Sequence, residues 1–108
     1  MQKDPKVFID HILSSIKDIQ TYTEGMNKEM FMLNKLVQDA VIRNIEIVGE
    51  AAKNLPQAFR NEHQHIPWRS IAGMRDVLIH DYMNADLEAV WTTVTQHLPA
   101  LKNNLEAL

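Results

Sequence analysis

Apolar residues recur at intervals of three and four positions along most of the chain, which is the spacing of amphipathic helices. The pattern predicts a first helix over residues 5–22. Asp4 is its expected capping residue, and Pro5 lies in the first turn, where a missing N–H costs nothing. Gly25 interrupts the pattern, and a long second helix is predicted over residues 28–54.

The second half of the chain continues the helical pattern. Residues 57–66 are polar and predict a short turn of helix followed by a loop. Pro67 is expected to open a third main helix, and Asn84 is suited to cap a fourth. Pro99 lies inside this fourth helix and predicts a kink, because proline removes a backbone N–H and collides with the preceding turn.

The expected architecture is therefore all-α, an antiparallel four-helix bundle with a short extra helical turn. We find no strand-like alternation, internal repeat or linker, so residues 1–108 are expected to form a single domain. The composition is that of a globular protein, with 45% hydrophobic residues, three glycines and four prolines in 108 residues.

Charge and cysteine content narrow the function classes. The absence of cysteine excludes disulfides and thiolate chemistry, and neither a signal core nor a membrane-length apolar run is present, so a cytoplasmic protein without membrane association is expected. A formal net charge of −3 argues against a general nucleic-acid coat protein. An RNA-cutting enzyme needs only a local basic cleft. Arg69 could contribute to such a cleft or be a solvated surface group, whereas Arg60 is read as a surface group.

The segment Arg75-Asp76-Val77-Leu78-Ile79-His80-Asp81-Tyr82 gathers chemistry suited to phosphate esters. The Arg75 guanidinium is always charged and presents a fork of donors to phosphate oxygens, while the His80 imidazole exchanges protons near neutral pH. Asp76 precedes His80 by four residues, a helical spacing at which its carboxylate could orient the ring. Seven residues separate Arg75 from Tyr82, so a continuous helix would place them on one stripe.

This motif and three further blocks resemble the HepT-like toxins of the HEPN ribonuclease superfamily. Arg75, His80 and Tyr82 match the family's pattern of an arginine, a gap of four to six residues, and a histidine followed at the second position by tyrosine. Similar blocks stand at residues 43–52, from Pro67-Trp68 to Gly73-Met74, and at Val90-Trp91 with His97-Leu98-Pro99.

The resemblance implies a metal-independent ribonuclease toxin with an HEPN-like fold. It implies a homodimer whose cleft joins both copies of the motif, and Arg75 and His80 as the catalytic residues. A cognate minimal nucleotidyltransferase antitoxin would silence the enzyme by transferring AMP to Tyr82. Asp76 departs from relatives, which often carry asparagine there, and could either repel RNA or support His80.

Other candidate sites carry weaker signals. His63 and His65 lie near Glu62 but lack the ordered ligand set of a zinc site, so no metal or cofactor is expected. Glu46 and Glu50 are interpreted as an exposed or Arg-paired stripe, with Arg43 three residues before Glu46, rather than as a glycosidase acid–base pair.

Two glycines, Gly49 and Gly73, stand inside predicted helices at a cost of about 1 kcal/mol each, which close helix or subunit approach would explain. The main hypothesis is a toxin-type RNA endonuclease, and the alternative is a non-catalytic helical dimer that binds a nucleotidyltransferase or a nucleotide. Convergence of Arg75 and His80 on one cleft favours the enzyme, and burial of either in a core salt bridge favours the binding module.

Overall fold

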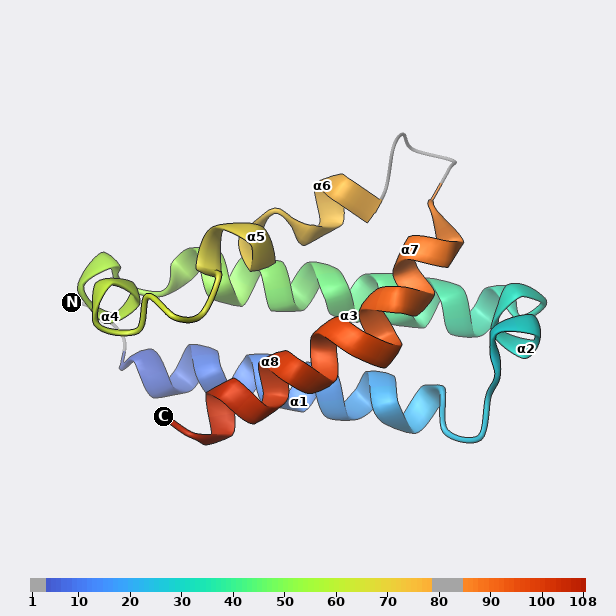
Figure 1. Ribbon diagram of the computed structural model, residues 1–108, viewed down its shortest axis with the longest axis horizontal. Helices are drawn as coiled ribbons and strands as arrows, with labels where there is room; N and C mark the ends of the chain where they lie inside the picture. The colour runs from blue at the N-terminus through green and yellow to red at the C-terminus, as the bar shows by residue number, and fades with distance from the viewer. Residues whose placement is uncertain (1–3, 79–84) are drawn as a thin grey trace.

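Two long antiparallel helices form the base of the fold. In the computed structural model, which describes residues 4–78 and 85–108, α1 (Pro5–Tyr22) and α3 (Lys35–Asn54) lie side by side and run in opposite directions (Figure 1). The Asp4 side chain accepts a hydrogen bond from the Lys6 N–H at 2.9 Å, so the predicted start of the first helix is confirmed. Both helices bury residues at the predicted spacing: Ile9, Ile12, Ile16 and Ile19 on α1, and Val41, Ile45, Val48 and Ala52 on α3.

The prediction of one continuous helix over residues 28–54 is wrong. The segment breaks at Leu33 and Asn34 into a short α2 (Lys28–Met32) and the long α3. The Asn34 side chain accepts a hydrogen bond from the Val37 N–H at 3.1 Å and so starts a new helix, because a side-chain acceptor satisfies an N–H that would otherwise lack a partner.

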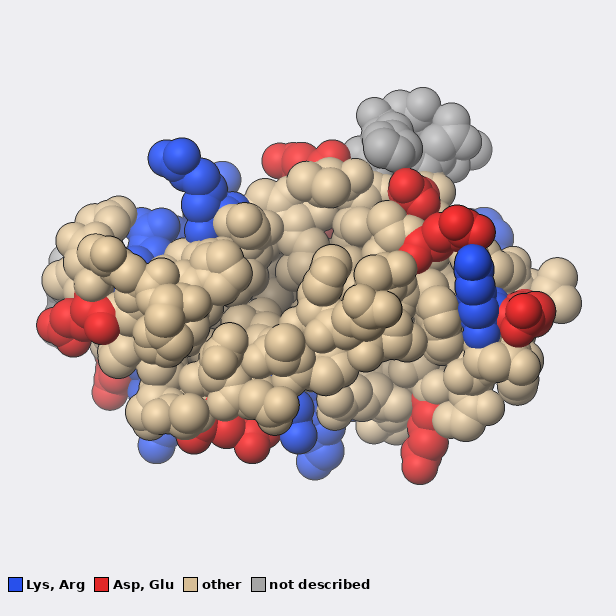
Figure 2. Space-filling model, in the orientation of Figure 1, with Lys and Arg blue, Asp and Glu red and all other residues tan. Residues whose placement is uncertain are grey.

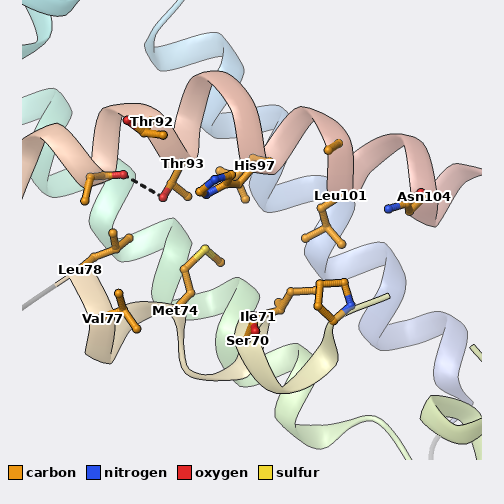
Figure 3. Close-up of a pocket in the computed structure, with 14 residues that line it drawn as sticks. Ser70, Ile71, Met74, Val77, Leu78, Thr92, Thr93, His97, Leu101 and Asn104 are labelled. Atoms are coloured by element: carbon orange, nitrogen blue, oxygen red, sulfur yellow. Dashed lines mark hydrogen bonds between the residues drawn. The ribbon is translucent and has the colours of Figure 1, made fainter. Parts of the chain in front are cut away.

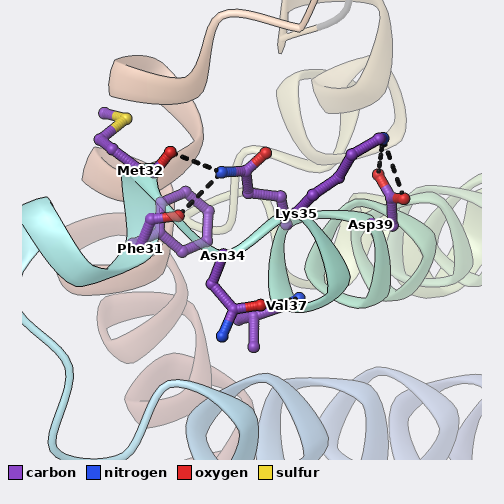
Figure 4. A network of polar contacts seen from close by, with 7 residues as sticks. Phe31, Met32, Asn34, Lys35, Val37 and Asp39 are labelled. Atoms are coloured by element: carbon purple, nitrogen blue, oxygen red, sulfur yellow. Dashed lines mark hydrogen bonds and ion pairs between the residues drawn. The ribbon is translucent and has the colours of Figure 1, made fainter.

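A buried glutamine holds the two sides of this break together. The Gln38 Nε2 donates to the carbonyl oxygens of Phe31 at 2.8 Å and Met32 at 3.1 Å (Figure 4). These carbonyls belong to the last turn of α2, where helical partners run out. Gln38 therefore replaces, through its side chain, the backbone bonds that a continuous helix would have made.

The middle of the chain forms short helices rather than one long one. The predicted turn after Pro56 is α4 (Gln57–Glu62). The expected third main helix is divided at Gly73 into α5 (Trp68–Ala72) and α6 (Met74–Leu78), and the Gly73 N–H closes α5 by donating to the Arg69 carbonyl at 3.1 Å. Arg75 thus belongs to a separate helix, which begins at Met74, instead of the one that Pro67 precedes.

The final helical segment runs from α7 (Leu87–Thr92) through a π-helical turn (Thr93–His97) to α8 (Leu98–Glu106). Its N-cap is Asp86, whose side chain accepts from the Ala89 N–H at 3.1 Å, whereas the predicted cap Asn84 lies outside the described residues. The π turn, after which the Leu98 N–H donates to the Thr93 carbonyl, ends two residues before Pro99, which lies in the first turn of α8; the predicted kink at Pro99 stays a prediction.

These helices enclose one apolar core. The helices α5 and α6 lie against α3, and the segment from α7 to α8 crosses in front of the α1–α3 pair in the view of Figure 1. The ring centroids of Phe31 and Trp91 lie 5.1 Å apart, and this contact links α2 to α7. The all-α prediction is confirmed for the described residues, and among them no helix is long and apolar enough to cross a membrane.

Candidate active site

Arg75 presents its guanidinium at the surface from the first turn of α6. Its side chain is 50% exposed, and its Nε lies 3.4 Å from Glu46 Oε1 on α3. A second, longer contact of 3.8 Å joins its Nη1 to Asp76 Oδ1. Arg75 is therefore accessible to an anion from solvent, and its ion pairs lie at the surface rather than in the core.

Glu46 connects two arginines through its two carboxylate oxygens. Oε1 contacts Arg75, and Oε2 lies 3.7 Å from Arg43 Nη1, one turn earlier on α3. The predicted pairing of Arg43 with Glu46 is thus confirmed. The contact with Arg75 was not predicted from the sequence, because it depends on how closely α6 approaches α3.

A glycine on α3 permits that approach. A Cβ on Gly49 would lie 3.2 Å from the carbonyl oxygen of Ala72, the last residue of α5. Such a distance is too short for an ordinary carbon–oxygen contact, so a side chain here would push α5 away. The predicted role of Gly49 in close helix approach is confirmed, and it brings the start of α6, with Arg75, over α3.

The other predicted site residues have different outcomes. Asp76 is exposed in the first turn of α6, next to Arg75. His80 and Tyr82 lie outside the described residues, so the convergence of Arg75 with His80, the Asp76–His80 contact and the shared stripe with Tyr82 stay predictions. Arg69 is exposed on α5, which is compatible with RNA binding and equally with a solvated surface role.

An apolar groove lies beside the helix that carries Arg75. It has a volume of about 620 Å³ and separates α5 and α6 from α7, the π turn and α8 (Figure 3). Side chains from both sides point into it, including Ile71, Met74 and Leu78 below and Leu101 above in that view. The residues that line the groove are Pro67, Ser70, Ile71, Met74, Val77, Leu78, Ala89, Thr92, Thr93, His97, Leu98, Ala100, Leu101 and Asn104.

The described part of this groove is uncharged. Among residues 4–78 and 85–108, the lining side chains include neither a lysine or arginine nor an aspartate or glutamate. In the same orientation as Figure 1, the coloured charged groups lie around the edge of the molecular face, and its centre is tan (Figure 2). The groove was missed from the sequence because its apolar residues have the same spacing as core residues.

The histidine-rich turn before α5 supports packing. The centroids of the His63 and Phe59 rings lie 4.6 Å apart. The backbone carbonyl of His63 accepts a hydrogen bond from Trp68 Nε1 at 3.0 Å. Across residues 4–78 and 85–108, no group of three or more histidine, aspartate and glutamate side chains is placed to hold a metal ion.

Comparison with known proteins gives consistent matches over nearly the whole chain. Residues 12–108 match the family described as Ribonuclease HepT-like. The chain is 42% identical over 108 residues to the "Probable ribonuclease HepT" of Thermococcus cleftensis, covering 100% of this chain and 98% of that protein.

A longer relative is similar to this chain over part of its own length. The "Gamma-glutamylcyclotransferase and putative RNase" of Methanocaldococcus jannaschii is 48% identical over 105 residues, which are 97% of this chain but only 47% of that protein. No solved structure matches the chain.

Proposed function

Because the chain belongs to the HepT-like ribonuclease family, we propose that it is a toxin-type, metal-independent RNA endonuclease with Arg75 and His80 as its catalytic residues. The observation that carries this proposal is the exposed guanidinium of Arg75, five positions before His80 in the motif. The side chain is half exposed and not locked in a core salt bridge, so Arg75 does not meet the criterion for a non-catalytic helical dimer, and its convergence with His80 stays a prediction.

The proposed reaction is an internal transesterification of RNA. The 2′-hydroxyl attacks the adjacent phosphorus, the bond from phosphorus to the 5′-oxygen breaks, and a 2′,3′-cyclic phosphate and a 5′-hydroxyl result. Arg75 would bind the nonbridging oxygens and stabilise the charge that develops on them. His80 would accept the 2′-hydroxyl proton or donate one to the departing 5′-oxygen, and Asp76 would support its orientation.

The proposed active form is a homodimer with both motifs at one cleft. Each motif supplies one histidine, so two copies could divide the roles of base and acid. The uncharged groove beside α6 is the surface best suited to an isologous interface, because an apolar surface gains most from being covered. Arg69, exposed on α5, would bind RNA at the edge of this cleft.

Control by a cognate minimal nucleotidyltransferase antitoxin completes the proposal. The Tyr82 hydroxyl would attack the α-phosphorus of ATP, pyrophosphate would leave, and the AMP attached to Tyr82 would add a phosphate close in sequence to Arg75 and His80, where it could occupy Arg75 and repel RNA. Co-expression with such an enzyme should add the mass of AMP to the wild-type chain but not to a Tyr82→Phe variant. Equal modification of both chains would contradict the assignment of Tyr82.

The decisive experiment is RNA cleavage by the purified protein in the presence of EDTA. The wild type should cleave RNA at an unchanged rate and leave 2′,3′-cyclic ends, while DNA, which lacks the 2′-hydroxyl, should stay intact. His80→Ala and Arg75→Ala should each lower the rate at least about 100-fold, the scale of losing a general acid–base or a transition-state charge contact. A rate that needs magnesium, or full activity in the His80→Ala variant, would overturn the proposal.

A further inference from the structure

The contact between Glu46 and Arg75 joins a rigid helix to a short one. Glu46 stands in the middle of the 20-residue α3, next to Ile45, which is buried. Arg75 belongs to α6, which has five residues and follows a break at Gly73. A flexible arginine side chain on a short helix has many rotamers, so a fixed partner on α3 would restrict where its guanidinium points.

The atoms involved leave part of the guanidinium available. Glu46 Oε1 lies 3.4 Å from the inner nitrogen Nε, not from the terminal nitrogens that usually grip a phosphate as a fork. The Asp76 carboxylate, 3.8 Å from Nη1, is more exposed than Glu46 and is the weaker competitor. Glu46 is thus placed to hold the Nε of Arg75 while the terminal nitrogens of the guanidinium stay available to the substrate.

Arg43 fixes the carboxylate on its other side. Because Glu46 Oε2 lies 3.7 Å from Arg43 and Oε1 contacts Arg75, the carboxylate is held between two cations. Asp76 also contacts Arg75, so this cluster holds two arginines and two carboxylates and carries no net charge. Removal of the Glu46 carboxylate would leave the cluster with one net positive charge.

We propose that Glu46 is a positioning residue that aims the Arg75 guanidinium at the scissile phosphate, an inference that rests on the proposed ribonuclease function. Loss of the carboxylate should therefore affect turnover and RNA binding in opposite directions. Turnover falls because Arg75 loses its orientation. RNA affinity stays the same or rises, because the cluster gains positive charge.

The test compares Glu46→Ala, Glu46→Gln and the matched control Glu50→Ala by RNA-cleavage kinetics. Glu50 is exposed one turn later on α3 and lines the same surface hollow as Glu46, so its removal changes the charge equally but leaves the Arg75 contact intact. We expect Glu46→Ala to lower kcat about 10- to 100-fold with an equal or lower KM, the scale of a misplaced catalytic group.

Glu46→Gln keeps an oxygen that can accept from Arg75 Nε, so its kcat should stay within about fivefold of the wild-type value. The kcat of Glu50→Ala should stay within about twofold of the wild-type value. A Glu46→Ala kcat within twofold of the wild type, or an equal loss in Glu50→Ala, would overturn the inference. A rise in KM as the main effect of Glu46→Ala would do the same.

A second measurement separates this inference from the ribonuclease proposal. In the ¹⁵N NMR spectrum, the Arg75 Nε–H should be protected from solvent exchange in the wild type and in Glu50→Ala, and should lose that protection in Glu46→Ala. Unchanged exchange in Glu46→Ala would overturn the positioning contact whether or not the protein cleaves RNA. If the wild type cleaves no RNA, the proposed function is wrong and Glu46 cannot serve catalysis. The NMR signal would still show, in that case, whether Glu46 contacts Arg75.

Discussion

At the scale of single residues, the Gln38 side-chain amide takes the place of two backbone hydrogen bonds. It donates to two carbonyls at the end of α2 from a largely buried position on α3. Nearby, Lys35 and Asp39 form an ion pair of 3.1 Å in which both side chains are exposed. The two interactions lie in the same turns of α3 but differ in their access to water (Figure 4).

This difference gives the first prediction. Gln38→Leu should lower the free energy of unfolding by about 1–3 kcal/mol, because it removes the side-chain donor to the Met32 carbonyl and leaves the Phe31 carbonyl with only its backbone donors. Lys35→Ala should cost no more than about 0.5 kcal/mol, since an exposed pair four residues apart contributes little in water. Urea unfolding followed by circular dichroism measures both. Equal losses in the two variants would show that the buried amide has no special role at this junction.

The candidate site shows which residue-scale features the sequence could indicate. Arg75 was predicted from its motif, and its exposure agrees with a role in binding anions. The Arg43–Glu46 pair was predictable because the spacing lies within one helix. The contact of Glu46 with Arg75 was not, because it joins two helices whose approach depends on tertiary packing. The positions of His80 and Tyr82 stay predictions.

At the scale of elements, the close approach of α5 to α3 determines where α6 begins. The backbone of α5 at Ala72 passes so close to Gly49 that a Cβ there would lie 3.2 Å from the Ala72 carbonyl oxygen, and α5 would have to shift by a few tenths of an ångström. Gly73 differs, because a Cβ there would meet its nearest neighbour at 3.5 Å, an ordinary contact. The two glycines therefore serve different purposes, close helix contact at Gly49 and a break between α5 and α6 at Gly73.

The second prediction follows from this contrast. Gly49→Ala should destabilise the fold by about 1–3 kcal/mol through overpacking against a backbone carbonyl, which outweighs the gain of about 1 kcal/mol in helix propensity. Gly73→Ala should be neutral or slightly stabilising, because its backbone has a negative φ that alanine adopts readily. Thermal unfolding of both variants decides the matter. Higher stability of Gly49→Ala than of the wild type would refute the close-contact role.

Hydrophobic periodicity predicted the helices well but not their interruptions. The first helix follows the expected boundaries because its capping signals, Asp4 and Pro5, are local. At Asn34 and Gly73, the hydrogen bonds of a continuous helix compete with hydrogen bonds and packing contacts to other parts of the chain. Neither residue forbids a helix, and only the contacts of Gln38 and Gly49 with other elements show why the breaks are favourable.

At the scale of the whole molecule, charge and apolar surface are separated. The net charge is −3, and the centre of the face shown in Figure 2 carries the uncharged groove between α5–α6 and α7–α8. Such a distribution is poorly suited to coating nucleic acid, and it leaves an apolar surface that a second copy of the chain could cover. Composition could indicate the charge balance, whereas the location of the groove required the arrangement of the helices.

The last prediction tests whether this groove is the dimer interface. Val77 lines the groove and is 70% exposed, although valine gains from burial, so a second copy could cover it. Val77→Glu would place a charge in that interface without disturbing the core. Light scattering at micromolar concentration should report twice the chain mass for the wild type and one chain mass for this variant, and RNA cleavage should fall together with dimerisation.

Leu36→Glu is the matched control, because Leu36 is 80% exposed near the start of α3 and is not among the residues that line the groove. The same apolar-to-acidic change there should leave both the mass and the cleavage rate unaltered. If Val77→Glu stays dimeric while Leu36→Glu becomes monomeric, the interface lies at the α2–α3 junction instead. Two copies would then meet away from α6, and the Arg75 residues could not share one cleft across the axis as proposed.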